Sequence, residues 1–243
     1  MFSNIVLGVV CPMANERDTA VPFATDVLSV CSRYGFKCVR FFAVLDNVST
    51  DDTRELLVER AETEHRLEVV WAPENRCIVD AYLTGYRSAL EAGSDWLLEI
   101  DAGYSHRPSD IPLLIEKMAE GYDCVFGSRF CEGGDMSQNS LKRRLLSRGG
   151  TLLSNILLRT KLKDMTSGFQ LFKRSAIEMI LRKGIRSSGP FFQTEMKAYC
   201  AALRTAEVPI TYSGANHSIG GGALADSFIG LWRLYRMRLQ GQL

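Results

Sequence analysis

The first half of the chain alternates short β-rich runs with segments of helix length, and this alternation constrains the fold more than any other feature. The expected strands cover 5–10, 38–45, 67–71, 95–100 and 123–128. Apolar residues at helical spacing predict helices near 20–34, 52–65, 77–92 and 109–120. Repeated strand–helix–strand units predict an α/β fold, with a mostly parallel sheet and helices on both faces.

The second half has a different pattern, which begins after the polar loop 131–140. A basic and then apolar helical stretch covers 141–163 and is interrupted by Gly149 and Gly150. The other expected elements are a strand at 168–173, helices near 174–183 and 191–203, a strand at 206–212 and a basic, aromatic terminal helix. We expect this helical region to complete a single domain over 1–243.

The composition excludes several classes of protein. Twenty-nine Lys and Arg balance 28 Asp and Glu, so we expect no nucleic acid partner and only a local anion site. Seven scattered cysteines without a C-x-x-C pair are typical of free thiols in a reducing cytoplasm. The first residues lack the basic region of a signal peptide, and no charge-free apolar stretch reaches the roughly 18–20 residues of a membrane span. We therefore expect a cytoplasmic protein that meets a membrane only at its cytoplasmic face or through a membrane-protein partner.

Polar clusters follow three of the expected strands. They read CPMANE (11–16), LDNVSTDDT (45–53) and DAGYSH (101–106). Ligands of open parallel sheets bind beyond the carboxyl ends of the strands, so Asp46 and Asp101 are expected to face one crevice. Each cluster alone is better explained by an ordinary loop, an Asx turn or the cap of a strand end. Their occurrence at three strand ends favours a binding site.

These clusters belong to a longer series of motifs that resembles a known family. CPMANE, VLDNVSTDDT, LEIDAGYSH, VFGSRF, LKRRLLSRG and DMTSGFQLF occur in this order between about residue 4 and 212. Together they resemble glycosyltransferase family 2, and within it the dolichyl-phosphate (polyprenyl-phosphate) mannosyltransferase group. The resemblance implies a GT-A fold, in which 1–130 would bind a nucleotide sugar and 131–243 would bind the acceptor.

The resemblance also implies a nucleotide-sugar site. Its expected members are Pro12, Ala14 and Glu16 in the first loop, Asp46 as the acid that contacts the nucleobase or ribose, and Asp101, Ala102, Gly103 and Ser105 after the fourth strand. Asp101 and Ala102 match the first two positions of the family's Asp-x-Asp metal motif. Gly103 stands where the second aspartate is expected.

A cation, Mg²⁺ or Mn²⁺, is therefore expected at a site with one aspartate fewer than usual. Magnesium is often bound by one or two carboxylates together with substrate phosphates, so Asp101 can suffice once a diphosphate is present. Glu99 lies two residues earlier, on the same face of the strand and roughly 6–7 Å back. We therefore expect Glu99 to support the metal-binding Asp101 rather than to bind the metal itself. The metal affinity is expected to be weaker than in a two-aspartate site.

By the same resemblance, Arg129, Arg143 and Ser147 match the positions that bind the phosphate of a lipid acceptor. Paired guanidinium donors and a hydroxyl suit a phosphate, although a basic run such as LKRRLLSR can also be a solvated helix face. Two apolar surfaces nearby suit either acyl chains or the protein's own core. They are Leu152, Leu153, Ile156 and Leu157 in the first, and Phe228, Leu231, Trp232, Tyr235 and Leu239 beside Arg233, Arg236 and Arg238 in the second.

Three functions follow from these residues. The first is an inverting, metal-assisted glycosyltransferase in which Asp101 and Arg129 are catalytic and a sugar passes from GDP-mannose or a UDP-sugar to a polyprenyl phosphate. The second transfers the sugar to a hydroxyl group, with Glu195 as the base. The third is a non-catalytic protein that binds nucleotide sugars, suggested by Gly103 and by a late loop, 214–224, that offers only His217 as a basic residue.

Overall fold

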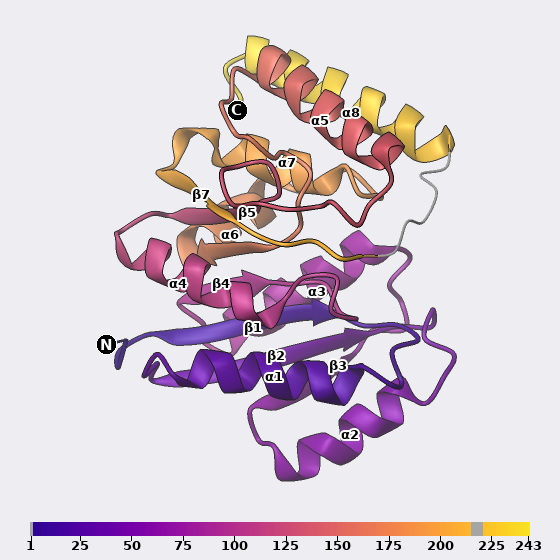
Figure 1. The fold of residues 1–243 in the computed structure, drawn as a ribbon, viewed down its shortest axis with the longest axis vertical. Coiled ribbons are helices and arrows are strands. Elements are labelled where there is room, and N and C mark those ends of the chain that lie inside the picture. Colours follow the sequence, from indigo (N-terminus) through magenta and orange to yellow (C-terminus); the bar gives the residue numbers. More distant parts are fainter. Residues whose placement is uncertain (1, 215–220) are drawn as a thin grey trace.

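A computed structural model describes residues 2–214 and 221–243, with side chains from residue 224 onwards in the second range. Seven strands in these ranges form one sheet in the order β3-β2-β1-β4-β6-β5-β7 (Figure 1). Their bounds are β1 Val6–Pro12, β2 Cys38–Leu45, β3 Leu67–Trp71, β4 Trp96–Glu99, β5 Cys124–Ser128, β6 Gln170–Lys173 and β7 Thr205–Pro209. β6 is antiparallel to its neighbours β4 and β5, and the other pairs are parallel, which confirms the expected mostly parallel sheet.

The helices of the described ranges agree with the expected ones to within a few residues. They are α1 Ala20–Ser32, α2 Thr53–Thr63, α3 Ile78–Glu91, α4 Ile111–Ala119, α5 Leu141–Leu158, α6 Arg174–Lys183, α7 Phe192–Tyr199 and α8 Gly221–Leu239. One expectation was wrong, because α5 runs through Gly149 and Gly150 without interruption. Two glycines lower helix propensity by about 1 kcal/mol each, which the contacts of the rest of α5 offset.

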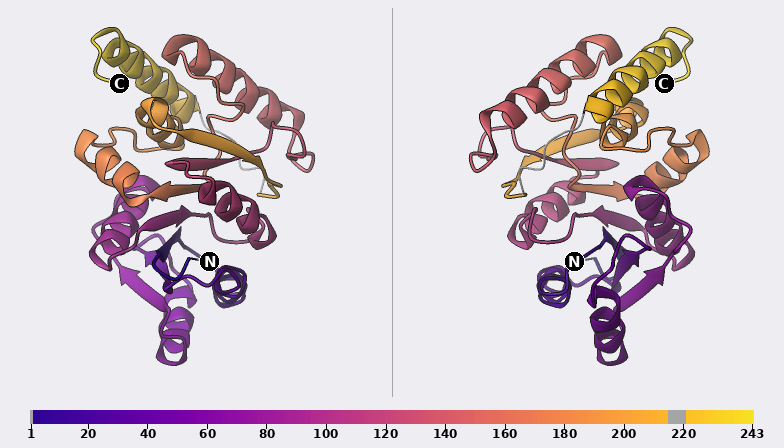
Figure 2. Two further views of the ribbon diagram at one scale, coloured as in Figure 1. Left: turned by 90° about the vertical axis from the view of Figure 1, so that its left-hand side faces the viewer. Right: turned by 90° about the vertical axis from the view of Figure 1, so that its right-hand side faces the viewer.

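Alternating side chains of the strands build a separate core on each face of the sheet. Leu7 and Val9 of β1 pack in the core beneath α1 and α4, whereas Val10 packs in the core beneath α3 and α6. Figure 2 shows these two pairs of helices on opposite sides of the sheet. At Gly85 in α3 an added Cβ would lie 2.3 Å from Val10 Cγ1, so this helix packs closer to the sheet than any side chain would permit.

α5 and α8 lie side by side beyond the β7 end of the sheet (Figures 1 and 2). The apolar stripe expected on the terminal helix divides between two environments. Leu231, with Leu234, is buried in the core, whereas Phe228 and Trp232 are exposed. Arg238 donates a 2.8 Å hydrogen bond to the carbonyl of Leu157 at the end of α5. Among the residues that the structure describes, no helix is both long enough and apolar enough to cross a membrane.

Candidate active site

The polar clusters after β1, β2 and β4 meet at one edge of the sheet, as expected, because β1 lies between the other two strands. Hydrogen bonds join the first two loops directly. The Asn15 side chain donates to the Val48 carbonyl at 3.1 Å and accepts from the Thr50 backbone N–H at 2.9 Å. The Glu16 backbone N–H donates to Thr53 Oγ1 at 2.7 Å. The two loops therefore form one continuous wall at the carboxyl edge of the sheet, at the point where strand order reverses.

Asp46 and the first loop lie in this wall. The Asp46 side chain is buried, and its Oδ1 accepts a 2.9 Å hydrogen bond from the Val48 backbone N–H. The Asx turn considered for Asp46 therefore exists, and it fixes the direction of the carboxylate at the strand end. Pro12 is buried at the end of β1, and Ala14 is partly exposed in the loop that follows.

Asp101 extends from the end of β4 with its side chain 40% exposed. The hydroxyl of Tyr82, in α3, donates a hydrogen bond to Asp101 Oδ1. The Asp101 backbone N–H donates to His106 Nδ1 at 3.4 Å, and the same nitrogen lies 3.5 Å from Asp101 Oδ2. Burial lowers the pKa of His106 to about 4, so the imidazole is neutral near pH 7 and forms no ion pair with the carboxylate. Asp101 thus presents a partly open carboxylate at the end of β4.

Glu99, in contrast, lies wholly inside the protein. It accepts hydrogen bonds from Tyr86, Gln170 and Gln193. Burial raises the pKa of Glu99 to about 8, so this group is mostly protonated near pH 7. Its hydrogen bonds lead into the core, whereas the hydroxyl that donates to the Asp101 carboxylate comes from Tyr82, one helical turn before Tyr86.

The oxygen donors at this edge fit a hard divalent cation. Within residues 2–214 and 224–243 no three His, Cys, Asp or Glu side chains cluster as a complete metal site. Mg²⁺ and Mn²⁺ prefer oxygen ligands, and Mg²⁺ is commonly bound by one or two carboxylates with substrate phosphates and water completing the shell. Asp101 would be the ligand here. Ala102 and Ser105 belong to the same turn, and the Ser105 carbonyl accepts from the Ser213 backbone N–H at 2.9 Å.

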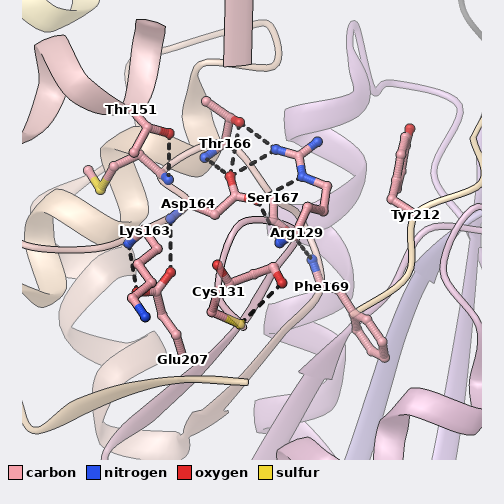
Figure 3. Close-up of polar contacts among 12 residues, drawn as sticks. Arg129, Cys131, Thr151, Lys163, Asp164, Thr166, Ser167, Phe169, Glu207 and Tyr212 are labelled. Carbon is pink, nitrogen blue, oxygen red and sulfur yellow. Dashed lines mark hydrogen bonds and ion pairs between the residues drawn. The ribbon is translucent and has the colours of Figure 1, made fainter. Parts of the chain in front are cut away.

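Arg129, directly after β5, is fixed by a buried ion pair. Its Nε and Nη2 donate to the two carboxylate oxygens of Asp164 at 2.7 and 2.8 Å, and Nη2 also donates to Thr166 Oγ1 at 2.5 Å (Figure 3). Burial alone would raise the pKa of Asp164, but the charge and hydrogen bonds of Arg129 keep it well below its usual range. The fork-to-fork geometry leaves the guanidinium with a single orientation.

A second buried basic residue, Lys197, supports the segment that carries Asp164. The Lys197 amine, in α7, donates to the carbonyls of Asp164 and Ser167 at 2.8 and 2.9 Å. Burial lowers the pKa of Lys197 to about 8. Glu207, in β7, accepts from the backbone N–H groups of Lys163 and Asp164 at 2.7 and 2.9 Å (Figure 3). The segment that carries Asp164 is therefore anchored on two sides.

Tyr212 brings Arg129 and Arg143 together. Their guanidinium carbons lie 5.5 and 5.4 Å from the centre of its ring, and Arg143 Nη2 donates to the Tyr212 hydroxyl at 3.1 Å. On the other side, the His106 ring lies 5.2 Å from the Tyr212 ring. The two arginines expected to act together are thus neighbours, and the residues between them and Asp101 are aromatic.

A groove of about 800 Å³ opens beside the arginines, between α5, α8 and the start of α7. Arg129, Arg143, Ser147 and Thr166 supply polar groups to its wall. The rest of the wall is largely apolar and includes Leu145, Leu146, Leu153, Phe191, Leu224, Phe228 and Leu231. Gly149 and Gly150 also line it, and an added Cβ on Gly149 would meet no atom within 4 Å. Because Gly149 and Gly150 have no side chains, this part of α5 leaves space open in the groove.

Glu195 does not have the environment expected of a general base. Its carboxylate is fully buried in α7 and accepts from the backbone N–H groups of Arg186 and Ser187 at 3.2 and 3.0 Å. It also pairs with Arg233 of α8 at 2.7 Å. A carboxylate occupied in this way is not exposed to an acceptor, and its role in this structure is to join α8 to α7.

The family is decided by sequence comparison. The family model described as Glycosyl transferase family 2 matches residues 9–181. The chain belongs to this family. It is therefore a glycosyltransferase, as the motifs predicted.

Two relatives confirm the narrower resemblance within glycosyl transferase family 2. The chain is 32% identical over 189 residues to an undecaprenyl-phosphate mannosyltransferase of Micrococcus luteus, covering 77% of this chain and 76% of that protein. It is 29% identical over 208 residues to a polyprenol monophosphomannose synthase of Mycolicibacterium smegmatis, covering 84% of this chain and 76% of that protein.

Solved structures support the GT-A fold. Glucosyl-3-phosphoglycerate synthase from Mycobacterium tuberculosis, in complex with Mn²⁺, uridine diphosphate and phosphoglyceric acid, matches with a TM-score of 0.70 at 16% identity. The match covers 96% of this chain and 79% of that chain. The same enzyme in complex with Mg²⁺ and uridine diphosphate matches with a TM-score of 0.68 at 18% identity, covering 96% and 80%.

Sequence reasoning missed several residues of the site, among them His106, Asp164, Thr166, Lys197 and Tyr212. Two of them lie in DMTSGFQLF and one in LEIDAGYSH, motifs that carried the family resemblance but were given no role at these positions. Tyr212, at the end of the last expected strand, could not be recognised from the sequence, because its role depends on Arg129 and Arg143, which lie far away in the sequence. His217, considered in the late loop, lies outside the described residues.

Proposed function

We propose that this glycosyltransferase moves a sugar from a nucleotide diphosphate sugar to a polyprenyl phosphate, and that the favoured sugar is mannose. One observation carries the proposal. The groove that begins at Arg129 and Arg143 continues along α5 and α8 with an apolar wall. A ligand with a phosphate at one end and a hydrocarbon chain behind it matches this division between charged and apolar surface.

The donor would bind at the edge formed by β1, β2 and β4. Pro12, Ala14 and Asp46 would contact the nucleoside, and Glu16 and the turn 101–105 would face the diphosphate. The chain's relatives are named for mannose transfer to polyprenyl phosphates, which favours GDP-mannose over UDP-sugars. Asp101 would bind Mg²⁺ or Mn²⁺, which would neutralise the charge of the departing diphosphate.

The acceptor phosphate is already anionic near neutral pH, so its attack needs no general base. One phosphate oxygen forms a bond to the anomeric carbon while the bond from that carbon to the diphosphate oxygen breaks, and the nucleotide leaves with the electron pair. Arg129 and Arg143, with Ser147, would align the attacking oxygen opposite the leaving group. An α-linked donor would give a β-linked product, with inversion.

Transfer to a hydroxyl group is the second candidate, and the environment of Glu195 argues against it. A hydroxyl acceptor must lose its proton in the transition state. The carboxylate proposed to take that proton is buried and paired with Arg233. A non-catalytic protein is the third candidate. The buried pair of Arg129 with Asp164 argues against it, because a structure that no longer binds a phosphate gains little from fixing an arginine at the end of a groove.

We also propose that the protein acts at the cytoplasmic face of a membrane, where its lipid substrate would be. Exposed apolar side chains gather on the two helices beside the groove, and they are Leu141, Leu145, Leu152, Leu153 and Ile156 on α5 and Leu224, Phe228, Ile229, Trp232 and Leu239 on α8. An apolar surface with arginines nearby suits the interface of an anionic bilayer.

A transfer screen tests the proposed function. Radiolabelled GDP-mannose, UDP-glucose and UDP-N-acetylglucosamine would each be incubated with Mn²⁺ and either a polyprenyl phosphate, the matching polyprenol or soluble sugars. We expect label in the lipid fraction only with the phosphorylated acceptor, and most of it from GDP-mannose. Transfer to the polyprenol or to soluble sugars alone would favour the second candidate, transfer to a hydroxyl group. Nucleotide-sugar binding by calorimetry without any transfer would favour the non-catalytic one.

A further inference from the structure

Position 103 has no side chain, and the carboxylate of Glu16 occupies the space where one would begin. An added Cβ at Gly103 would lie 2.7 Å from Glu16 Oε1 and 3.0 Å from Oε2. Non-bonded atoms in proteins do not approach a Cβ this closely. The carboxylate of the first loop therefore lies against the turn that follows Asp101, at the position where the sequence lacks its expected second acid.

The position of Glu16 is set by the residues around it. Its backbone N–H donates to Thr53 Oγ1 at the start of α2, and its carbonyl accepts from the Thr19 and Ala20 N–H groups at 2.9 and 2.7 Å at the start of α1. The Thr19 hydroxyl also donates to Glu16 Oε2. These bonds fix the glutamate backbone between two helix starts and direct its side chain toward Gly103.

We propose that Glu16 supplies the second carboxylate of the donor site in place of a side chain at position 103. This proposal rests on the proposed function, since it concerns the cation and diphosphate of the same site. Asp101 and Glu16 together would give the two negative charges of an Asp-x-Asp motif, one from each of two neighbouring strand ends. Two carboxylates with substrate phosphates are a usual protein contribution to Mg²⁺ and Mn²⁺ binding.

The two positions are therefore coupled. Replacing Gly103 by Asp in the wild-type chain would bring its Cβ into the Glu16 carboxylate and place two like charges in contact. The backbone at Gly103 has φ +69°, a conformation that aspartate and asparagine adopt more readily than other side chains. Shortening Glu16 to Ala removes both the steric conflict and the like charge, so an aspartate at 103 should be accommodated better in that background than in the wild-type chain.

The test is a Mn²⁺ titration of the full chain, with free Mn²⁺ followed by electron paramagnetic resonance in saturating GDP and, in a second arm, in UDP. The variants are Glu16→Ala, Gly103→Asp and the double variant. Asp18→Asn is the matched control, because this acid lies in the same loop with its side chain 92% exposed. Thermal unfolding of each variant reports on folding, and nucleotide affinity without Mn²⁺ reports on direct nucleotide contacts.

We expect Glu16→Ala to weaken Mn²⁺ binding at least about tenfold and the double variant to regain most of that loss. Gly103→Asp alone should bind Mn²⁺ no more tightly than the wild type and unfold at a lower temperature. Asp18→Asn should resemble the wild type. Wild-type Mn²⁺ affinity in Glu16→Ala, or no recovery in the double variant, would overturn the inference while leaving lipid transfer intact. A wild type that binds no Mn²⁺ with either nucleotide would overturn both the inference and the metal-assisted part of the proposed function.

Discussion

Tyr212 lies against His106, with ring centres 5.2 Å apart, and so connects the two ends of the site. His106 accepts a hydrogen bond from the backbone of Asp101, and the Tyr212 hydroxyl accepts one from Arg143. The proposed donor and acceptor sites therefore share a wall of aromatic rings. A change in this wall should affect acceptor binding first, because Tyr212 contacts the arginines directly.

Tyr212→Phe should raise the KM for the lipid phosphate about fivefold and leave the KM for the nucleotide sugar unchanged. The reason is that the ring remains, but the hydrogen bond to Arg143, worth about 1 kcal/mol, is lost. Tyr212→Ala should raise the acceptor KM further, because both arginines also lose the aromatic ring beside which their guanidinium groups lie. Initial rates at varied acceptor and donor concentrations measure this. An equal rise in both KM values would show that Tyr212 acts on the whole site rather than on the acceptor.

Asp164→Asn should lower the free energy of unfolding by about 3–5 kcal/mol, because it leaves the Arg129 guanidinium buried without its counter-charge. Urea unfolding followed by circular dichroism measures the change. Glu178→Gln is the control, since Glu178 forms a half-exposed pair with Arg174, one helical turn away, that is worth about 0.5 kcal/mol or less. Similar small losses for the two variants would mean that the Arg129 pair contributes no more than a surface ion pair.

The sequence predicted the donor edge of the sheet better than the acceptor end. Strand ends can be located from period-two patterns followed by polar residues, and parallel neighbours then place Asp46 and Asp101 at one edge. The burial and pairing of Glu195 could not be predicted in this way, because its partner Arg233 lies on a different helix. The same is true of Arg129 and Asp164, which meet only because β6 enters the sheet between β4 and β5.

The glycines show a second limit of sequence reasoning. Gly149 and Gly150 were expected to interrupt a helix, yet packing of α5 outweighs their low propensity. Gly103 was interpreted as a missing ligand, because a sequence shows which side chain is absent but not which neighbour fills the space. The contact with Glu16 is visible only once the first and fourth strand ends lie side by side.

The buried amine of Lys197 predicts a specific dependence of stability on pH. Burial lowers its pKa from 10.5 to about 8 in the folded protein. Between these pH values the unfolded chain binds one more proton than the folded one, so stability should increase as pH rises through this window. In Lys197→Met that increment is absent, whereas the other titrating groups are common to both proteins.

The measurement compares the free energy of unfolding of wild type and Lys197→Met from pH 7 to pH 10.5. The difference, wild type minus variant, should stay constant up to about pH 7.5 and then increase. A difference that remains constant, or that decreases with pH, would show that the folded protein does not depress the pKa of this amine.

The exposed apolar surface of α8 predicts binding to membranes. Replacing Phe228 and Trp232 together by Ser should weaken sedimentation with vesicles of phosphatidylglycerol and phosphatidylcholine by about tenfold or more, because two large apolar side chains no longer enter the interface. Leu113→Ser is the control, since this leucine is exposed on α4 and does not line the groove. α4 itself lies apart from α5 and α8 (Figure 1). Equal binding by the double variant and the control would place the membrane contact elsewhere.

The most direct test of the account is the rate of transfer to a polyprenyl phosphate and to the polyprenol of the same length, measured for the wild type and for Arg143→Gln. If Arg129 and Arg143 bind the acceptor phosphate, the wild type should transfer sugar to the phosphate and scarcely to the alcohol. Arg143→Gln should lose about tenfold or more in kcat/KM for the phosphate only, since charge-assisted hydrogen bonds to a phosphate are worth about 1.5–3 kcal/mol. Equal transfer to both acceptors, or an Arg143→Gln variant that retains full kcat/KM for the phosphate, would contradict the proposal that this groove binds a lipid phosphate.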